Sequence, residues 1–137
     1  MKNILVLCTG NSCRSQMAHG YLKGFLKGQA NVYSAGIETH GLNQDAVKFM
    51  AEDGIDISDH QSNHIDEYMD VQFDLILTVC DHANETCPYF PSTAEKVHQN
   101  FEDPSKYLGT VEERKAKFRE VRDQIKNYCR NLAEKLN

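Results

Sequence analysis

The sequence lacks any long run of apolar residues. The N-terminal run at positions 4–7 is only four residues long before Cys8 interrupts it. A signal-peptide core needs about 7–15 apolar residues, and a membrane-spanning helix needs about 20. We therefore expect a cytoplasmic protein that is not held in a membrane.

The sequence also has fewer positively charged residues than negatively charged ones. The chain has 15 Lys and Arg residues against 20 Asp and Glu residues, so its formal net charge is −5. A broad electrostatic attraction to nucleic acid or to anionic lipid needs the opposite balance. Nucleic-acid binding is not expected, and any anionic ligand has to be captured by a local site.

The chain contains no internal repeat, low-complexity tract or linker. Its 137 residues are 40% apolar and 26% charged, which suits one globular domain with a single core and leaves no room for a second. We expect one domain over residues 1–137, acting as a monomer.

Short apolar runs alternate with longer segments of helical periodicity. The expected strands are residues 3–7, 31–35, 73–79 and 97–101, and the expected helices are residues 15–27, 43–52 and 110–136. Gly28 and Gly54 suit helix ends. Strands alternating with helices predict a single-domain α/β fold, with a doubly wound, mainly parallel four-stranded sheet flanked by helices. In such sheets, ligands bind beyond the carboxyl ends of the strands.

The segment after the first expected strand carries the strongest chemical signal. It reads Cys8-Thr9-Gly10-Asn11-Ser12-Cys13-Arg14-Ser15. Backbone N–H groups in such a turn, with the donors at the start of the following helix, converge on a tetrahedral oxyanion. Gly10 permits the close turn, and Arg14 can add a bidentate clamp. We therefore predict that Thr9, Gly10, Asn11, Ser12, Cys13, Arg14 and Ser15 bind an anionic substrate.

The same positive environment favours the thiolate of Cys8. An unperturbed cysteine, with a pKa of about 8.5, is only a few per cent ionised near neutral pH. We expect the loop to lower the pKa of Cys8, with the Ser15 hydroxyl as a candidate donor to its sulfur. The alternative is that the segment is only a Gly/Asn/Ser turn around a small buried cysteine. The presence of Arg14 and Ser15 makes this alternative less favoured.

The chain has five cysteines, at positions 8, 13, 80, 87 and 129. In a reducing compartment such thiols are more often catalytic or metal-binding than paired in permanent disulfides. Cys13 and Cys129 are interpreted as packing residues. Cys80 and Cys87 could be unrelated core residues or zinc ligands with His82, but no paired CxxC or HxxxH supports zinc.

These residues resemble the low-molecular-weight tyrosine phosphatase fold and, within it, the thioredoxin-coupled arsenate reductases. The resemblance covers nearly the whole chain. Its motifs are the loop extended to 8–18, Tyr-Ser-Ala-Gly-Ile-Glu-Thr-His-Gly at 33–41, Asp-Ile-Ser at 56–58, Thr-Val-Cys-Asp at 78–81, Cys-Pro at 87–88 and Asp-Pro at 103–104. The loop alone indicates the phosphatase-like fold, whereas Cys80 and Cys87 favour the reductase.

The resemblance implies a three-thiol reduction of arsenate, which mimics phosphate in shape and charge. Cys8 attacks arsenate, Cys80 attacks Cys8 to release arsenite, and Cys87 then takes over Cys80. Thioredoxin reduces the Cys80–Cys87 disulfide, and no cofactor is expected. If residues 80–87 were helical, the two Cα atoms would lie about 10.5 Å apart, beyond the roughly 7 Å limit for a disulfide. The polar segment 81–86 is therefore predicted to be weakly held and to change conformation on oxidation.

Asp103 lies in an expected loop, because the residue before a proline is pushed out of the helical region. The resemblance implies that Asp103 is the general acid, and a plain Asp-Pro turn is the alternative. Some arsenate reductases of this type bind potassium. The matching positions are Asn11, Ser34, His19 and Asn63, which lack both carboxylates, so no metal is expected.

Two other functions stay open at this point. A phosphatase acting on phosphotyrosine or small phosphate esters needs the loop and Asp103, but neither Cys80 nor Cys87. A redox sensor would use Cys80 and Cys87 as a switch, but it would not need Arg14 to bind arsenate.

Overall fold

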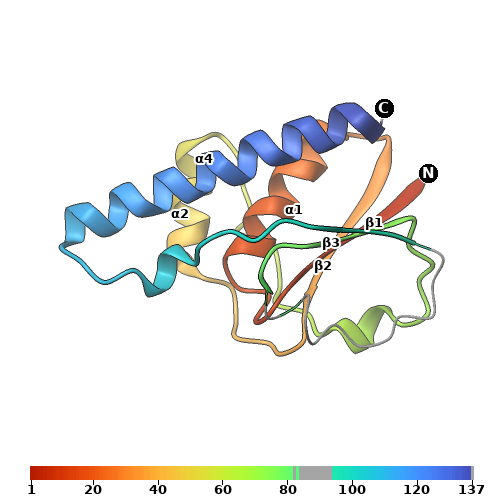
Figure 1. Ribbon diagram of the computed structural model, residues 1–137, viewed down its shortest axis with the longest axis horizontal. Coiled ribbons are helices and arrows are strands. Elements are labelled where there is room, and N and C mark those ends of the chain that lie inside the picture. Colours follow the sequence, from red (N-terminus) through yellow and green to blue (C-terminus); the bar gives the residue numbers. More distant parts are fainter. Residues whose placement is uncertain (82, 84–93, 137) are drawn as a thin grey trace.

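A parallel sheet forms the centre of the molecule. In the computed structural model, which describes residues 1–81, 83 and 94–136, four strands lie in the order β2-β1-β3-β4, and each neighbouring pair is parallel. The strands are β1 (Lys2–Cys8), β2 (Ala30–Gly36), β3 (Leu75–Thr78) and β4 (Glu95–His98). The predicted α/β fold with a parallel four-stranded sheet is confirmed (Figure 1).

The helices of the described residues agree with the sequence periodicity. They are α1 (Arg14–Phe25), α2 (Gln44–Glu52) and α4 (Val111–Leu136), with two short 3-10 helices, η1 (Ile65–Tyr68) and η2 (Pro104–Lys106). Gly28 and Gly54 follow α1 and α2 with φ angles of 75° and 79°, the left-handed conformation that commonly ends a helix. Within these described residues, no helix is both long enough and apolar enough to cross a bilayer.

Strand β4 differs from the predicted range 97–101, because it begins at Glu95 and ends at His98. It is an edge strand in which only Val97 is partly buried, so no apolar pattern marks it in the sequence. Beyond His98 the chain still follows β3, since Phe101 N–H donates to the Val79 carbonyl at 3.1 Å. The apolar signal of Phe101 therefore belongs to the segment after the strand.

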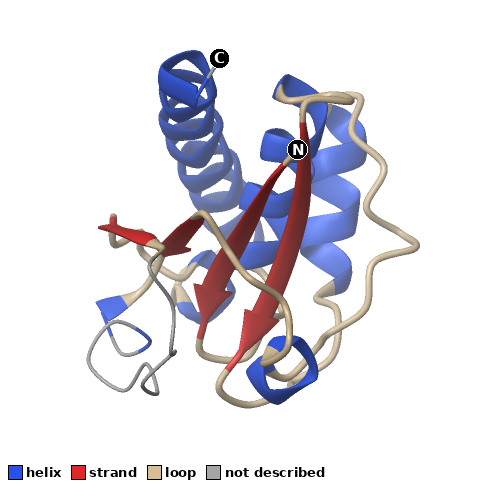
Figure 2. Ribbon diagram, turned by 90° about the vertical axis from the view of Figure 1, so that its right-hand side faces the viewer, coloured by secondary structure: helices blue, strands red, loops and turns tan. Residues whose placement is uncertain are grey.

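Both faces of β1 are buried, as the sequence predicts. Ile4 and Val6 belong to the cluster formed with α1, α2 and α4, whereas Leu5 and Leu7 belong to the opposite cluster with Ile65 of η1. These four β1 side chains have no exposed surface, and burial of each such side chain contributes about 1.5–3 kcal/mol. Figure 2 shows the long helices gathered on one side of the strands. The carboxyl end of β1 is thus fixed from both sides.

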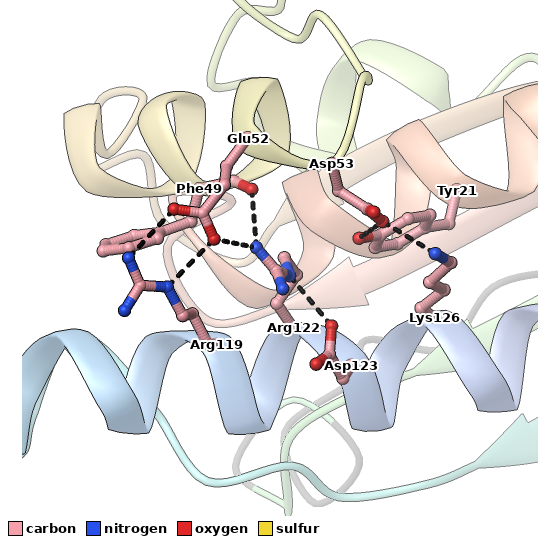
Figure 3. Close-up of polar contacts among 8 residues, drawn as sticks. All are labelled: Tyr21, Phe49, Glu52, Asp53, Arg119, Arg122, Asp123 and Lys126. Carbon is pink, nitrogen blue, oxygen red and sulfur yellow. Dashed lines mark hydrogen bonds and ion pairs between the residues drawn. The ribbon is translucent and has the colours of Figure 1, made fainter.

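Ion pairs join the end of α2 to α4 (Figure 3). Glu52 at the end of α2 accepts from Arg119 Nε and Nη2 at 2.9 and 3.0 Å and from Arg122 Nη1 at 2.8 Å. Arg122 is 8% exposed and its Nη1 also donates to the Phe49 carbonyl at 3.1 Å. Charge-assisted hydrogen bonds of this kind are stronger than neutral ones. Arg122 is therefore the central side chain of this contact.

Replacing Arg122 by alanine is expected to lower the free energy of unfolding by about 2 kcal/mol, because the buried Phe49 carbonyl loses its donor and Glu52 loses a partner. Urea unfolding followed by circular dichroism measures the change. Arg114→Ala on the exposed face of α4 is the control and should cost less than about 0.5 kcal/mol. Equal losses in the two variants would contradict the role given to Arg122.

Candidate active site at the carboxyl ends of β1 and β3

The loop from Cys8 to Ser15 lies where the sequence predicts it, between the end of β1 and the start of α1. The neighbouring segment 38–43 holds it through three carbonyls: Thr9 accepts from Glu38 N–H at 2.9 Å, Gly10 from His40 N–H at 3.0 Å and Ser12 from Asn43 N–H at 3.0 Å. In a trans peptide the N–H points opposite to the C=O. The N–H groups that follow these carbonyls therefore point away from segment 38–43, as an anion-binding loop requires.

Asn11 shapes this loop from behind. It is fully buried and has a φ of 47°, so the left-handed residue of the turn is Asn11, not Gly10. Its Nδ2 donates to the Ser34 carbonyl at 3.2 Å, and its Oδ1 accepts from Ser15 Oγ at 2.9 Å. The Ser15 hydroxyl is thus committed to Asn11, and it is not the donor to Cys8 that the sequence suggested. Gly10 is needed for another reason, since a Cβ there would collide with the His40 ring.

A cavity of about 700 Å³ opens in front of the loop. Its walls include five of the predicted substrate-binding residues, Thr9, Gly10, Ser12, Cys13 and Arg14, together with Cys8, Cys80 and Asp103. Asn11 and Ser15 lie behind the loop and do not line it. Sequence reasoning missed six further wall residues, because nothing in the local pattern ties them to the loop: Glu38, His40, Asp81, Asn100, Ser105 and Lys106.

Arg14 and Asp103 are brought together at this cavity. Arg14 Nη1 donates to the Phe101 carbonyl at 2.8 Å, and Arg14 Nη2 lies 3.7 Å from Asp103 Oδ2. The other carboxylate oxygen of Asp103 accepts from the backbone N–H and hydroxyl of Ser105, at 3.0 and 2.6 Å. Asp103 is therefore the N-cap of η2 and also faces Arg14 with its second oxygen. These contacts hold the Arg14 guanidinium at the wall of the cavity. Because its ion pair with Asp103 is long, the guanidinium stays available to an anion in the cavity.

Cys8 and Cys80 line the same cavity, and their thiols interact with each other. Both cysteines are buried and neither forms a disulfide. The Cys80 sulfur also accepts from the backbone N–H of Ala83 and lies 3.3 Å from Thr9 Oγ1. Because β1 and β3 are adjacent parallel strands, their carboxyl ends place these two residues side by side.

The expectation of a lowered Cys8 pKa is not met in this reduced form. Interaction with Cys80, together with burial, raises the pKa of Cys8 above its usual range. The same interaction, with those from Thr9 and Ala83, lowers the pKa of Cys80 to about 5. Of the two thiols, that of Cys80 is therefore the one that ionises more readily. The sequence could not reveal this, because it depends on a contact between residues far apart in the chain.

The remaining predicted thiols separate into two groups. Cys13 is buried in the loop and Cys129 is buried on α4, and burial raises the pKa of both, that of Cys129 to about 12. Both are therefore protonated packing residues near neutral pH, as the sequence predicts. Cys87, like His82, lies outside the described residues.

The four positions matched to a potassium site lie close together behind the loop. His19 Nδ1 is 2.8 Å from Ser34 Oγ, and Asn11 Nδ2 donates to the Asn63 carbonyl at 3.4 Å. The His19 ring stacks on His60 with 4.4 Å between centroids, and burial lowers the pKa of His19 to about 3. These side chains form a neutral hydrogen-bonded group that supports Asn11.

Comparisons with known proteins agree with this geometry. The model of the family described as low molecular weight phosphotyrosine protein phosphatase matches residues 3–137. Relatives named arsenate reductase include those of Halalkalibacterium halodurans, 53% identical over 133 residues, and Bacillus subtilis, 50% identical over 133 residues; each alignment covers 97% of this chain and 96% of the relative.

Solved structures give the same two kinds of neighbour. An arsenate reductase in the phosphate-binding state has a TM-score of 0.82 at 33% identity, with all of both chains covered. A low molecular weight protein tyrosine phosphatase from T. tengcongensis has a TM-score of 0.81 at 25% identity, covering 98% of this chain and 99% of that one. The same fold therefore accompanies two activities among these neighbours.

Proposed function

This chain belongs to the low molecular weight phosphotyrosine protein phosphatase family, and on that premise we propose that it is an arsenate reductase regenerated by thioredoxin. The observation that carries the proposal is the contact between the thiols of Cys8 and Cys80. Hydrolysis of a phosphate ester needs one thiol, whereas reduction of As(V) to As(III) needs two electrons and hence a second thiol. The relatives named arsenate reductase support the same choice.

In the first step, arsenate binds to the loop with Arg14 as its cationic partner. The Cys8 sulfur attacks arsenic, so that an S–As bond forms and one As–O bond breaks. The thiol proton of Cys8 passes to an arsenate oxygen, and Asp103 protonates the oxygen that leaves as water. Asp103 is suited to this role because its Oδ2 lies at the cavity beside Arg14.

In the second step, the Cys80 thiolate attacks the Cys8 sulfur. An S–S bond forms, the S–As bond breaks, and its electron pair stays on arsenic, which leaves as arsenite. Two thiols are oxidised to one disulfide while arsenic gains two electrons. The contribution of the Cys8 thiol to the lowered pKa of Cys80 ends when Cys8 is bonded to arsenic, but Thr9, the Ala83 N–H and Arg14 still favour the Cys80 thiolate.

In the third step, the Cys87 thiolate attacks Cys80, releases Cys8 as a thiolate and leaves a Cys80–Cys87 disulfide that the dithiol of thioredoxin reduces. Cys87 and most of segment 81–86 lie outside the described residues, so the conformational change of that segment stays a prediction. A reducing cytoplasm suits this cycle. The monomeric state also stays a prediction.

A weak phosphatase activity is the second candidate. Arg14, Asp103 and Cys8 line one cavity of about 700 Å³, which leaves room for the organic group of a small phosphate ester. The phosphatase from T. tengcongensis with the same fold supports this side activity.

The proposal is tested in a coupled assay that contains the wild-type protein, arsenate, thioredoxin and thioredoxin reductase. Oxidation of NADPH by thioredoxin reductase reports turnover. We expect sustained oxidation that requires both arsenate and thioredoxin. Hydrolysis of an aryl phosphate is measured in parallel on the same preparation. A protein that hydrolyses the ester but shows no arsenate-dependent turnover would be a phosphatase, and the proposal would be wrong.

A further inference from the structure

A hydrogen-bonded bridge links the ends of β3 and β4 beside Cys80. Thr78 Oγ1 lies 2.7 Å from His98 Nδ1, and His98 Nε2 lies 2.7 Å from Asp81 Oδ1. The Asp81 carboxylate can only accept, so Nε2 carries a proton and, in the neutral ring, Nδ1 accepts from the Thr78 hydroxyl. Thr78 is 5% exposed and is the register partner of His98, which anchors the bridge in the sheet.

Asp81 is also held through its backbone. Its N–H donates to Asn100 Oδ1 at 3.0 Å, and Asn100 belongs to the segment that continues past β4 along β3. Asp81 is thus held at two points, by His98 at the end of β4 and by Asn100 just after it. We call this set, Thr78, Asp81, His98 and Asn100, the Asp81 clamp.

The Asp81 clamp bears on Cys80 because Asp81 lies between Cys80 and Ala83. The Cys80 sulfur interacts with the Ala83 N–H and with the Cys8 thiol, and both interactions depend on how Asp81, the residue after Cys80, is held. Position 81 contributes no apolar anchor, and its side chain is 66% exposed. Cys80 and Ala83 are both buried, and the two polar bonds of Asp81 act together with this burial in setting the direction in which the Cys80 sulfur points.

We propose that His98 is a positioning residue, which holds Cys80 in the orientation for attack on Cys8 by clamping Asp81 to the end of the sheet. The role rests on the proposed relay, because it matters to the reaction only if Cys80 attacks Cys8. His98 does not line the cavity and touches neither sulfur. His98 reaches the cavity only through Asp81 in its wall, so its main effect is on the thiol–disulfide step, and it does not contact the loop that binds the oxyanion.

The test measures formation of the Cys8–Cys80 disulfide in a Cys87→Ser background, with the bond located by peptide mass spectrometry. His98→Ala is expected to slow this step about tenfold, since small misplacements of reacting atoms cost this much or more. It should also shift alkylation of Cys80 by iodoacetamide to higher pH, because the thiolate loses its Ala83 donor. Hydrolysis of an aryl phosphate should stay within about twofold of wild type.

Two variants serve as controls. His98→Gln places an amide donor near the position of Nε2 and should restore most of the rate, whereas Lys96→Ala, on the exposed face of the same strand, should change nothing. A His98→Ala rate equal to that of Lys96→Ala would overturn the proposal. So would a parallel loss of aryl phosphate hydrolysis, which would indicate general damage to the site.

The oxidant separates this inference from the proposed function. Formation of the disulfide is measured once with arsenate and once with diamide. Diamide oxidises two thiols to a disulfide and does not have to bind to the loop. If arsenate fails to oxidise the wild-type protein, the reductase proposal fails, while the diamide rates still decide the role of His98.

Discussion

Replacing Cys8 by serine is expected to abolish arsenate reduction and aryl phosphate hydrolysis together, each by about a thousandfold or more. Both reactions begin with a bond from the residue at position 8 to arsenic or phosphorus. A serine hydroxyl is not ionised near neutral pH and is a much weaker nucleophile than a cysteine sulfur, and the Ser15 hydroxyl, which donates to Asn11, cannot act as its base. The coupled NADPH assay and hydrolysis of the ester measure the two losses.

The loop itself should survive this change. Its shape depends on Asn11, Gly10 and segment 38–43, none of which involves the Cys8 sulfur. Cys8→Ser should therefore still bind inorganic phosphate in calorimetric titration, within a few-fold of wild type. Cys129→Ala, which removes a buried thiol remote from the cavity, is the control and should keep both activities. Retention of either activity in Cys8→Ser would refute its role as nucleophile.

The local parts of this site follow from the sequence. An apolar strand, a Gly/Asn/Ser turn and an amphipathic segment are adjacent in the chain, so the strand–loop–helix unit around Cys8 and Arg14 can be predicted from periodicity alone. Asp103 before Pro104 is likewise predicted as a loop residue, and the structure places it beside Arg14. The rule for parallel sheets predicts that Cys80 lies near the loop, because it follows a neighbouring strand.

The non-local parts could not be predicted. Which group the Ser15 hydroxyl contacts depends on the left-handed turn at Asn11, and the sequence does not fix that turn. The opposite shifts in the pKa values of Cys8 and Cys80 depend on a contact between residues 72 positions apart in the chain. The bridge from His98 to Asp81 depends on the register of β4, an edge strand whose bounds the apolar pattern misplaced.

Replacing Cys80 by serine should separate the two activities that Cys8→Ser removes together. Arsenate-dependent turnover is expected to fall to background, because no thiol is left to attack Cys8 and release arsenite. Ester hydrolysis is expected to persist, since Cys8, Arg14 and Asp103 are unchanged. Loss of both activities in Cys80→Ser would mean that Cys80 supports the loop, and continued turnover with arsenate would exclude it from the relay.

The acid–base behaviour of Cys8 gives this variant a second readout. In the wild type the Cys80 sulfur holds the negative charge of the pair and raises the pKa of Cys8. A neutral serine at position 80 removes that charge while Arg14 remains, so the pKa of Cys8 should fall and its alkylation by iodoacetamide should begin at lower pH. In the wild type, formation of the Cys8–Cys80 disulfide with diamide, which starts from the two free thiols, should instead slow as the pH falls through about 5, where Cys80 takes up a proton. An unchanged pH profile for Cys8 in Cys80→Ser would show that the two thiols do not shift each other's pKa, and the attack of Cys80 would then need another source of its thiolate.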